Sequence, residues 1–456
     1  MKRIQYVGVG TSTFQSDPLP RDEKGSFKLA SDWNYWVSRR RLAKETLPQL
    51  SKHFPDYVAF LERLGVNMFR FSLEPDLVLR PGTFDECVMK RYVQQMALLR
   101  LHGIEPFLTL NHYTMPFDST GISGKNGEIV QNAWELRGAR GYFHFLVDNV
   151  TRFLADDDKV RAVLQDMQLD AKEQDRLIAN GLVRHFMTIN EPMAVIGHGN
   201  VIGIFPPHRK GRVDIALIVL QKLVAAHDIA YELLKGMAYR KGWSVHVGIG
   251  HNWQYHQGFG SSFFRGIEHF VADKFERDGT HTDFVGLQYY CWMDDLWRGK
   301  RPDTYGRYLD WGDVYPEGIR KTLERMHQRY PGKPLWVTEF GFSDERDLRR
   351  PWWILETMRH IDVASREGVP VEGVLLWTLA HNFEWNRGMQ EHFGLRAEAE
   401  LTQPLGAGEY NPMSIRSESA FHAVAQAMLH PSPEGDKLLD DANRRALRQF
   451  KMASEK

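Results

Sequence analysis

The chain has 456 residues, of which 43% are hydrophobic and 25% are charged, as in an ordinary soluble globular protein. Its 58 basic residues balance 58 acidic ones, so no net field attracts nucleic acid or an anionic membrane. The first residues lack the apolar core of a signal peptide, no run of 18 apolar residues occurs, and two cysteines suit a reducing compartment, so we expect a cytoplasmic protein.

Eight short, β-rich apolar runs recur along the chain, separated by segments with helical periodicity. In chain order, strands are predicted at 6–13, 66–73, 104–113, 185–191, 245–252, 283–290, 334–341 and 372–379. This alternation, with no Gly/Ser or Pro linker, predicts an α/β fold: a single-domain (β/α)8 TIM barrel with long loops at its C-terminal face. The longest connection, 114–184, must carry helices of its own. We expect the barrel domain to span 1–430 and a charged C-terminal helix or tail to span 431–456.

A doubly wound sheet is the alternative architecture, and it would need a phosphate loop after an early strand. The candidate, "GVGTST" at 8–13, has Thr13 in place of the third glycine, so no dinucleotide cofactor is predicted. No metal site is predicted either, because HExxH and a His/Cys cluster at the strand ends are both missing. His246, His251 and His256 invite a metal interpretation, but an alternating strand would scatter them.

The C-terminal ends of the strands carry the chemistry in such barrels, and here they are rich in polar groups. Two of these groups are carboxylates, Glu191 and Glu339, from different strands. Either one alone would more often be a structural ion-pair residue. Two carboxylates facing one cavity, however, meet the minimum requirement for glycoside hydrolysis, in which one protonates the leaving oxygen and the other attacks carbon or activates water. Arg70 could pair with Glu339 and keep it ionised, whereas Glu191 has the neutral Asn190 beside it.

Five segments, in order, resemble the motifs of family 1 glycoside hydrolases, the β-glucosidase and β-galactosidase family. They are "TINEP", "DFVGLQYY", "DWGDVYPEGI", "VTEFG" and "LLWTLAHNFEWNRGMQEHFGL". The resemblance runs from about Gly8 to the segment at 416–426, nearly the whole chain. The family is a retaining one, so the resemblance implies that Glu191 is the acid/base and Glu339 the nucleophile.

The resemblance also implies a set of sugar-binding and supporting residues. The hydroxyls of the non-reducing sugar would be held by Gln15, His112, Asn190 and Glu384. Trp377 would lie flat beneath the sugar ring, and Trp385 would contact the far hydroxyls. Arg70 and Tyr290 would orient Glu339 and adjust its pKa. These types suit the task, since amides and carboxylates bind vicinal hydroxyls and an indole offers a flat apolar face. Outside these motifs, His112 and Trp377 would more often be core residues.

Several positions depart from the family pattern, and they concern the pocket wall rather than the catalytic pair. Phe340 and Gln288 stand where the family has asparagine, Tyr113 and Glu74 where it has tryptophan, and His381 where it has aspartate. These changes bear on the preferred sugar and its partner group. The retained Glu384 disfavours 6-phosphorylated sugars, because two anions would repel each other.

The expected function is therefore a retaining β-glycosidase, which removes terminal non-reducing β-D-glucosyl, galactosyl or fucosyl residues through a covalent glycosyl-enzyme. Its partner would be a small-molecule β-glycoside or oligosaccharide, with no nucleic acid, membrane, cofactor or metal. Two alternatives stay open: a non-catalytic carbohydrate-binding protein and a transglycosylase on the same scaffold. Trp352 and Trp353 either line the entrance for the sugar's partner group or pack in the core.

Overall fold

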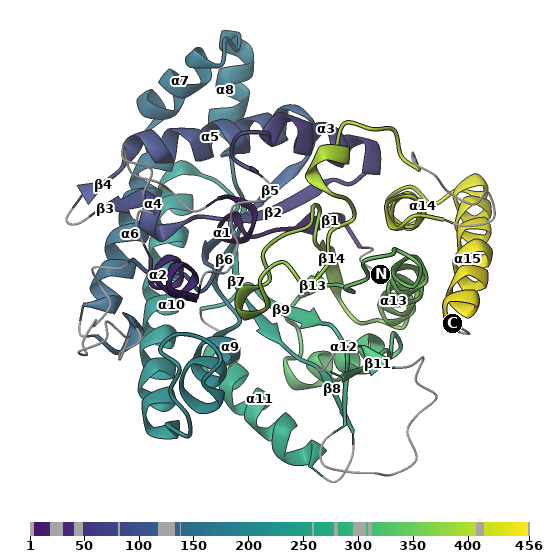
Figure 1. The fold of residues 1–456 in the computed structure, drawn as a ribbon. Helices are drawn as coiled ribbons and strands as arrows, with labels where there is room; N and C mark the ends of the chain where they lie inside the picture. The colour runs from purple at the N-terminus through teal and green to yellow at the C-terminus, as the bar shows by residue number, and fades with distance from the viewer. Residues whose placement is uncertain are drawn as a thin grey trace.

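A closed barrel of eight parallel strands forms the centre of the protein (Figure 1). The computed structural model describes residues 4–18, 31–40, 49–80, 83–116, 133–136, 138–257, 260–277, 281–294, 307–308, 312–406 and 415–454. The barrel strands are β1 (Tyr6–Gly10), β2 (Met68–Ser72), β5 (Glu105–Asn111), β6 (His185–Asn190), β7 (His246–Asn252), β9 (Phe284–Tyr289), β13 (Leu335–Phe340) and β14 (Val371–Trp377). They follow chain order around the barrel, and β14 closes it on β1. The predicted (β/α)8 barrel and its eight strands are confirmed.

Helices surround the barrel and join its strands (Figure 1). They include α3 (Phe54–Leu64), α5 (Glu86–Leu101), α6 (Ala139–Ala155), α10 (Val213–Lys241), α11 (Ser261–Glu276), α12 (Gly318–Arg329), α13 (Arg350–Arg366) and α14 (Ser417–Leu429). Local sequence sets their ends. Asp85 caps α5 by accepting from the backbone N–H groups of Cys87 and Val88. Gly65 ends α3 in the left-handed conformation, at φ 67°.

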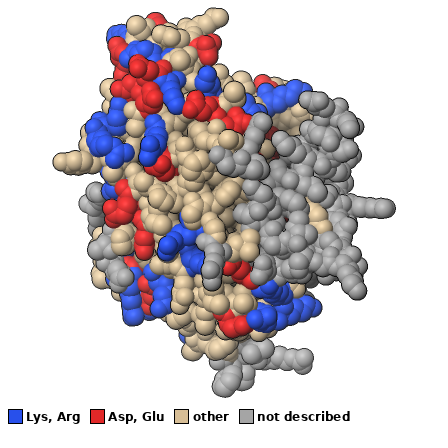
Figure 2. Space-filling model, turned by 90° about the vertical axis from the view of Figure 1, so that its left-hand side faces the viewer, with Lys and Arg blue, Asp and Glu red and all other residues tan. Residues whose placement is uncertain are grey.

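The long connection between β5 and β6 carries its own helices, as predicted. It holds the 3-10 turn η2 (Ala133–Glu135), α6, α7 (Asp157–Asp166) and α8 (Ala171–Asn180). Asp156 and Asp170 cap α7 and α8 through their side chains. Basic and acidic residues are interspersed over α7 and α8, at the top of the view in Figure 2, while a broad area in the middle of that face is uncharged.

Shorter elements decorate the ends of the barrel. The helical ones are α1 (Thr13–Ser16), α2 (Asp32–Arg40), α4 (Pro75–Val78), α9 (Pro192–Ile196), the π-helix η3 (Gly197–Ile202), and the 3-10 turns η5 (Trp385–Arg387) and η6 (Glu398–Glu400). A four-stranded sheet contains β8 (Tyr255–Gln257), β10 (Trp292–Asp294), β12 (Gly312–Asp313) and β11 (Arg307–Tyr308), while β3 (Leu79–Arg80) pairs with β4 (Thr83–Phe84). These elements are additions to the barrel and leave its closure intact.

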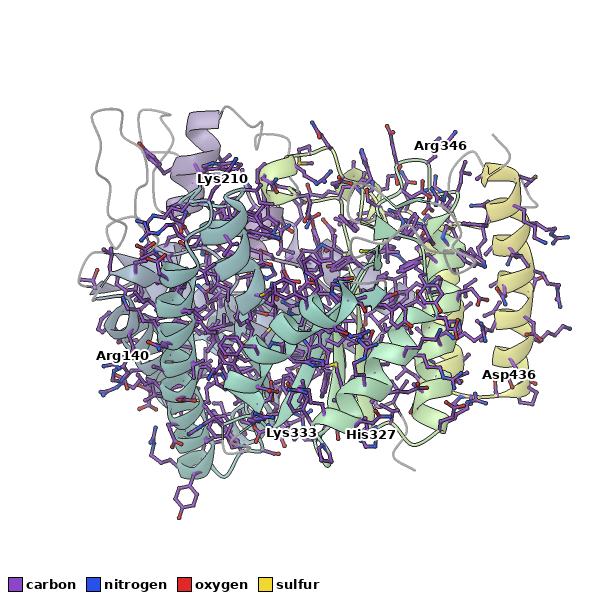
Figure 3. The ribbon with its side chains drawn as sticks, turned by 90° about the horizontal axis from the view of Figure 1, so that it is seen from below. Arg140, Lys210, His327, Lys333, Arg346 and Asp436 are labelled. Atoms are coloured by element: carbon purple, nitrogen blue, oxygen red, sulfur yellow. The ribbon has the colours of Figure 1, made fainter. Side chains whose placement is uncertain are left out.

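An apolar plug fills the lower part of the barrel interior. Its buried members are Met68, Phe107, Met187, Phe284, Trp336 and Leu375. Strand glycines make room for it: a Cβ built on Gly373 would lie 2.2 Å from the Trp336 ring. In Figure 3, Lys333, just before β13, and Arg346, beyond its end, lie at opposite ends of the barrel. The polar side chains of the predicted site lie on the other side of this plug, at the C-terminal ends of the strands.

The C-terminal segment, expected as a charged helix or tail, forms helix α15 (Pro433–Ser454). One face is buried through Ala442, Ala446 and Phe450. The Phe450 ring lies 4.3 Å from that of Trp352, which is 3% exposed. Trp353 is fully buried. Both tryptophans therefore pack in the core. Among the described residues, no helix is long and apolar enough to cross a membrane.

Candidate active site

Glu191 stands at the exact point where β6 leaves the barrel. Its backbone N–H donates to the Gly250 carbonyl at 2.9 Å, and its φ is 42°, in the left-handed region. Pro192 follows as the first residue of α9, and a proline disfavours the right-handed helical conformation in the residue before it. The Asn-Glu-Pro sequence thus turns the chain sharply and holds the Glu191 side chain near the barrel mouth.

Arg70 connects three barrel strands beneath the opening. Its Nη1 donates to Oε1 of Glu339 at 2.6 Å, and its Nη2 donates to Oδ1 of Asn190 at 2.7 Å. The same guanidinium donates to Thr109 Oγ1 and to the Thr338 carbonyl, at 2.9 and 3.1 Å. The ion pair is almost wholly removed from solvent, with the two side chains 0% and 5% exposed. A buried ion pair is tolerated only when its remaining polar atoms are bonded, as they are here.

Two further donors hold the carboxylate of Glu339. The Tyr290 hydroxyl donates to Oε2 at 2.6 Å. Gln288 Nε2 lies 2.9 Å from Oε1 and 2.7 Å from Asn190 Oδ1. Burial raises the pKa of Glu339, while Arg70 and Tyr290 pull it back down. Donors on both oxygens and a bonded cation give Glu339 the environment of an ionised carboxylate.

Glu191 has a different environment. The Tyr113 hydroxyl donates to its Oε2, and Asn252 acts to lower the pKa of the carboxyl group. Burial and the neighbouring charge of Glu339 raise the pKa of Glu191 to about 8. The nearest cation, Arg70, is bonded to Glu339 instead. The two carboxyl groups therefore differ as an acid and a nucleophile must differ.

The six positions expected to bind sugar gather around this pair. The His112 ring lies 5.7 Å from Trp377 and 5.8 Å from Trp385, stacked on both. His112 Nε2 is 3.2 Å from the Asn190 amide nitrogen, which links the ring to the catalytic end of β6. Gln15 Nε2 donates to Glu384 Oε2 at 3.2 Å. All ten predicted site residues thus lie in one connected cluster, although their roles stay predictions.

Comparisons with known proteins agree with this geometry. The sequence model described as "Glycosyl hydrolase family 1" matches residues 298–397. A β-galactosidase from Sulfolobus acidocaldarius is 24% identical over 87% of this chain and 91% of its own length. β-Glucosidase A from Thermotoga maritima is 23% identical over 85% of this chain and 91% of its own. The chain is thus similar to glycosyl hydrolase family 1 over residues 298–397, and to proteins named β-galactosidase and β-glucosidase over most of its length.

Two other comparisons add detail. A galactolipid galactosyltransferase, SFR2, of Arabidopsis thaliana is 25% identical over 74% of the chain, which spans about half (51%) of that relative's length. The β-glucosidase structure from Pyrococcus furiosus has a TM-score of 0.76, with 97% of this chain and 98% of that one covered. At 19% identity, this structural likeness supports the barrel fold alone.

Three of the residues that depart from the family 1 pattern have clear structural roles here. Gln288 bridges Asn190 and Glu339. Glu74 accepts from the backbone N–H of Phe14 at 2.8 Å and so supports the segment that carries Gln15. Phe340 is fully buried. A phenyl ring offers no hydrogen bond, so this position contributes packing only.

The site has contributors that the sequence did not identify as such. Tyr113 was noted only as a departure from the family pattern, yet its hydroxyl donates to Glu191, and Asn252 acts to lower the pKa of Glu191. The signal for Asn252 was its place at the end of β7. His381 lies next to His392, with ring centroids 5.1 Å apart, and burial lowers its pKa to about 3. Its ring is neutral at neutral pH, unlike the family's aspartate.

The histidine trio is scattered, as expected. His251 bonds Glu276 at 3.0 Å, His256 bonds Glu268 at 2.8 Å, and His246 stacks on His185. In the described part of the chain, no group of three or more His, Cys, Asp or Glu side chains could hold a metal ion.

Proposed function

We propose that the protein is a retaining β-glycosidase that removes a terminal non-reducing β-glycosyl residue from a small-molecule glycoside or oligosaccharide. The observation that carries this proposal is the asymmetric carboxyl pair at one barrel mouth. Glu339 is bonded to Arg70, Tyr290 and Gln288, and Glu191 is held without a cation of its own.

The chemistry follows from this asymmetry. Glu339 attacks the anomeric carbon while the protonated Glu191 gives its proton to the leaving oxygen. The glycosyl ester that forms removes the negative charge of Glu339. Because that charge is one cause of the raised pKa of Glu191, the pKa then falls, and Glu191 can take a proton from water in the second step. One residue thereby serves first as acid and then as base.

Unpartnered polar atoms suit a sugar ligand. His112 Nδ1 and Gln15 Oε1 are buried and have no hydrogen-bond partner among the described residues. Such atoms cost free energy unless a ligand or water satisfies them. Burial lowers the pKa of His112 well below its usual value, so the ring is neutral and can face a hydroxyl. Trp377 and Trp385 supply apolar faces beside these groups.

The presence of Glu384 favours a glucosyl, galactosyl or fucosyl substrate over a 6-phosphorylated sugar. Burial, followed by the charge of Glu339, raises its pKa well above the usual value. A phosphate brought against it would add a further negative charge to a site that already holds Glu339 and Glu191. A panel of nitrophenyl glycosides of both anomers, with 6-phospho versions, would identify the sugar.

The decisive test is turnover by the Glu339→Gln variant. Cleavage of an activated aryl β-glycoside should vanish, because the amide cannot attack carbon. Glu268→Gln is the matched control, since Glu268 is also a buried carboxylate but bonds His256 outside the site; it should keep its activity. Glu191→Gln should impair poor leaving groups more than activated ones, with external azide partly restoring the rate. Wild-type rates for Glu339→Gln would refute the assignment.

Transglycosylation is a second candidate, favoured by the similarity to a protein named a galactolipid galactosyltransferase. A sugar or alcohol would then replace water in the second step. Product analysis at high acceptor concentration separates the two outcomes. Lack of cleavage for every aryl glycoside would instead favour a binding protein. Cys87 is exposed and Cys291 is buried, and the two are not joined by a disulfide, which accords with the proposed cytoplasmic location.

A further inference from the structure

Tyr113 is held rigidly against the carboxyl group of Glu191. It follows β5 in the left-handed conformation, at φ 72°, and is 7% exposed. Its ring packs edge-on against Trp385 at 4.7 Å and against Phe205 at 5.6 Å. The hydroxyl donates to Glu191 Oε2. Because aromatic neighbours fix the ring, the hydroxyl is presented to this carboxylate in one orientation.

The contact is a departure from the family pattern at the position after the sugar-binding histidine. Tryptophan is usual there, and an indole N–H lies at a different place from a phenolic hydroxyl. In this chain the substitution puts a hydroxyl donor on the acid/base residue itself. The change therefore bears on proton transfer as well as on the shape of the wall.

Resting on the proposed β-glycosidase function, we propose that Tyr113 is a positioning residue that fixes the Glu191 carboxylate and favours its ionised form, and so promotes the second, base-catalysed step. A hydroxyl donor stabilises a carboxylate more than a neutral carboxylic acid, because charge-assisted hydrogen bonds are the stronger ones. Burial and the charge of Glu191 raise the pKa of Tyr113 well above its usual value. The phenol therefore stays a donor throughout the working pH range and does not titrate itself.

Other groups also act on Glu191, and none of them is altered by a change at Tyr113. Among the described residues, those that act on Glu191 or on its neighbour Asn190 include Glu339, Glu384, Arg70, Tyr290 and His112, and His198 packs on Phe205, which contacts the Tyr113 ring. Burial lowers the pKa values of His112 and His198, the latter to about 4, so both rings are neutral near pH 7. A difference between wild type and Tyr113→Phe thus reports the single hydroxyl.

The experiment uses Tyr113→Phe, which keeps the ring and its packing. Loss of a hydrogen bond to a charged group should raise the pKa of Glu191 and move the basic limb of the kcat/KM profile upward by about one to two pH units. With a highly activated aryl glycoside, the second step limits turnover. There kcat should fall about tenfold or more at pH 6, with a burst of aryl alcohol, and azide should restore the rate because it needs no base.

Tyr290→Phe is the matched control, since it removes the other phenolic donor, the one on Glu339. Tyr290→Phe should move the acidic limb of the kcat/KM profile to higher pH and leave the basic limb in place. Azide should not restore its rate. A merely structural role for Tyr113 would lower activity without moving the basic limb. That result, or a limb within about 0.3 pH units of wild type, would overturn the inference.

A readout independent of turnover separates this inference from the proposed function. The carboxyl resonance of Glu191 in protein carrying ¹³C-labelled glutamate, assigned by its loss in Glu191→Gln, gives the pKa directly. If the pKa of Glu191 rises in Tyr113→Phe but the protein cleaves no glycoside, the inferred effect of Tyr113 on Glu191 stands and the proposed glycosidase function is refuted. An unchanged pKa in an active enzyme would refute the role of Tyr113 alone.

Discussion

Replacing Arg70 by methionine should produce a loss of stability that grows with pH. Arg70 is fully buried and is bonded to Glu339 at 2.6 Å. Removing one partner of a buried ion pair leaves an uncompensated charge, which costs about 3–5 kcal/mol. Part of the loss is independent of pH, because the bonds to Asn190 and Thr109 disappear as well. Both hydrogen bonds have a charged donor and contribute about 1.5–3 kcal/mol each.

The remaining part depends on the ionisation of Glu339. Burial already raises its pKa above the usual 4.5, and Arg70 opposes this rise, so the pKa rises further without the arginine. The folded variant then binds more protons than the unfolded chain between pH 4.5 and the raised pKa. Its unfolding free energy must fall as pH increases through that window. Towards lower pH Glu339 of the variant becomes protonated, and towards higher pH its buried charge is unpaired.

Urea unfolding at pH 5, 6, 7 and 8 measures this dependence, with Arg70→Met/Glu339→Gln as the second arm. The loss of unfolding free energy in Arg70→Met, relative to wild type, should be greater at pH 8 than at pH 5 by at least about 2 kcal/mol. In the double variant the extra loss should vanish, because no carboxylate is left to desolvate. A deficit that is constant with pH, or strictly additive effects of the two substitutions, would refute the ion-pair argument.

Two further predictions concern the acid/base residue and the barrel plug. The pKa of Glu191 is raised to about 8 in the folded protein. Between about pH 4.5 and pH 8, folded Glu191 therefore keeps a proton that the unfolded chain has lost. The unfolding free energy should fall by a few kcal/mol as the pH rises through this range. Glu191→Gln should remove this slope and be more stable than wild type at pH 8; equal slopes in urea titrations would contradict it. In the plug, Gly373→Ala places a Cβ 2.2 Å from Trp336, and thermal unfolding should show a loss of about 1–3 kcal/mol. A wild-type unfolding midpoint for this variant would show that the ring shifts freely.

The barrel was predictable because its strands are buried on both faces. Such strands are continuous apolar runs, and the pattern marks them without reference to neighbours. Their ends are set by tertiary contacts. The strand expected at 6–13 stops at Gly10, since the Thr13 N–H bonds the Ser72 hydroxyl of β2 at 3.0 Å and α1 begins there. Gln15 consequently reaches the site from a helical turn rather than from a strand end.

The site was predictable where a strand end alone decides a side chain's place. Arg70 with Glu339 was foreseen on that ground, and the structure shows the contact. Tyr113 was not foreseen as a partner of Glu191, because its direction depends on a φ of 72° beyond the end of β5. The two hydrogen bonds of the Gln288 amide, to Asn190 and Glu339, were not foreseen either. They depend on the reach of the glutamine side chain, which is one methylene longer than the asparagine usual at this position.

The charge balance of the site connects these findings. Glu191, Glu339 and Glu384 all have raised pKa values, and among the described residues only one cation, Arg70, is bonded to any of the three. Full ionisation would leave two unpaired negative charges in a buried space, so the site retains protons near neutral pH. In the proposed mechanism, the glycosyl ester at Glu339 removes one of these charges. The pKa of Glu191 then falls, so that the carboxylate left after proton donation stays ionised and can act as the base in the second step.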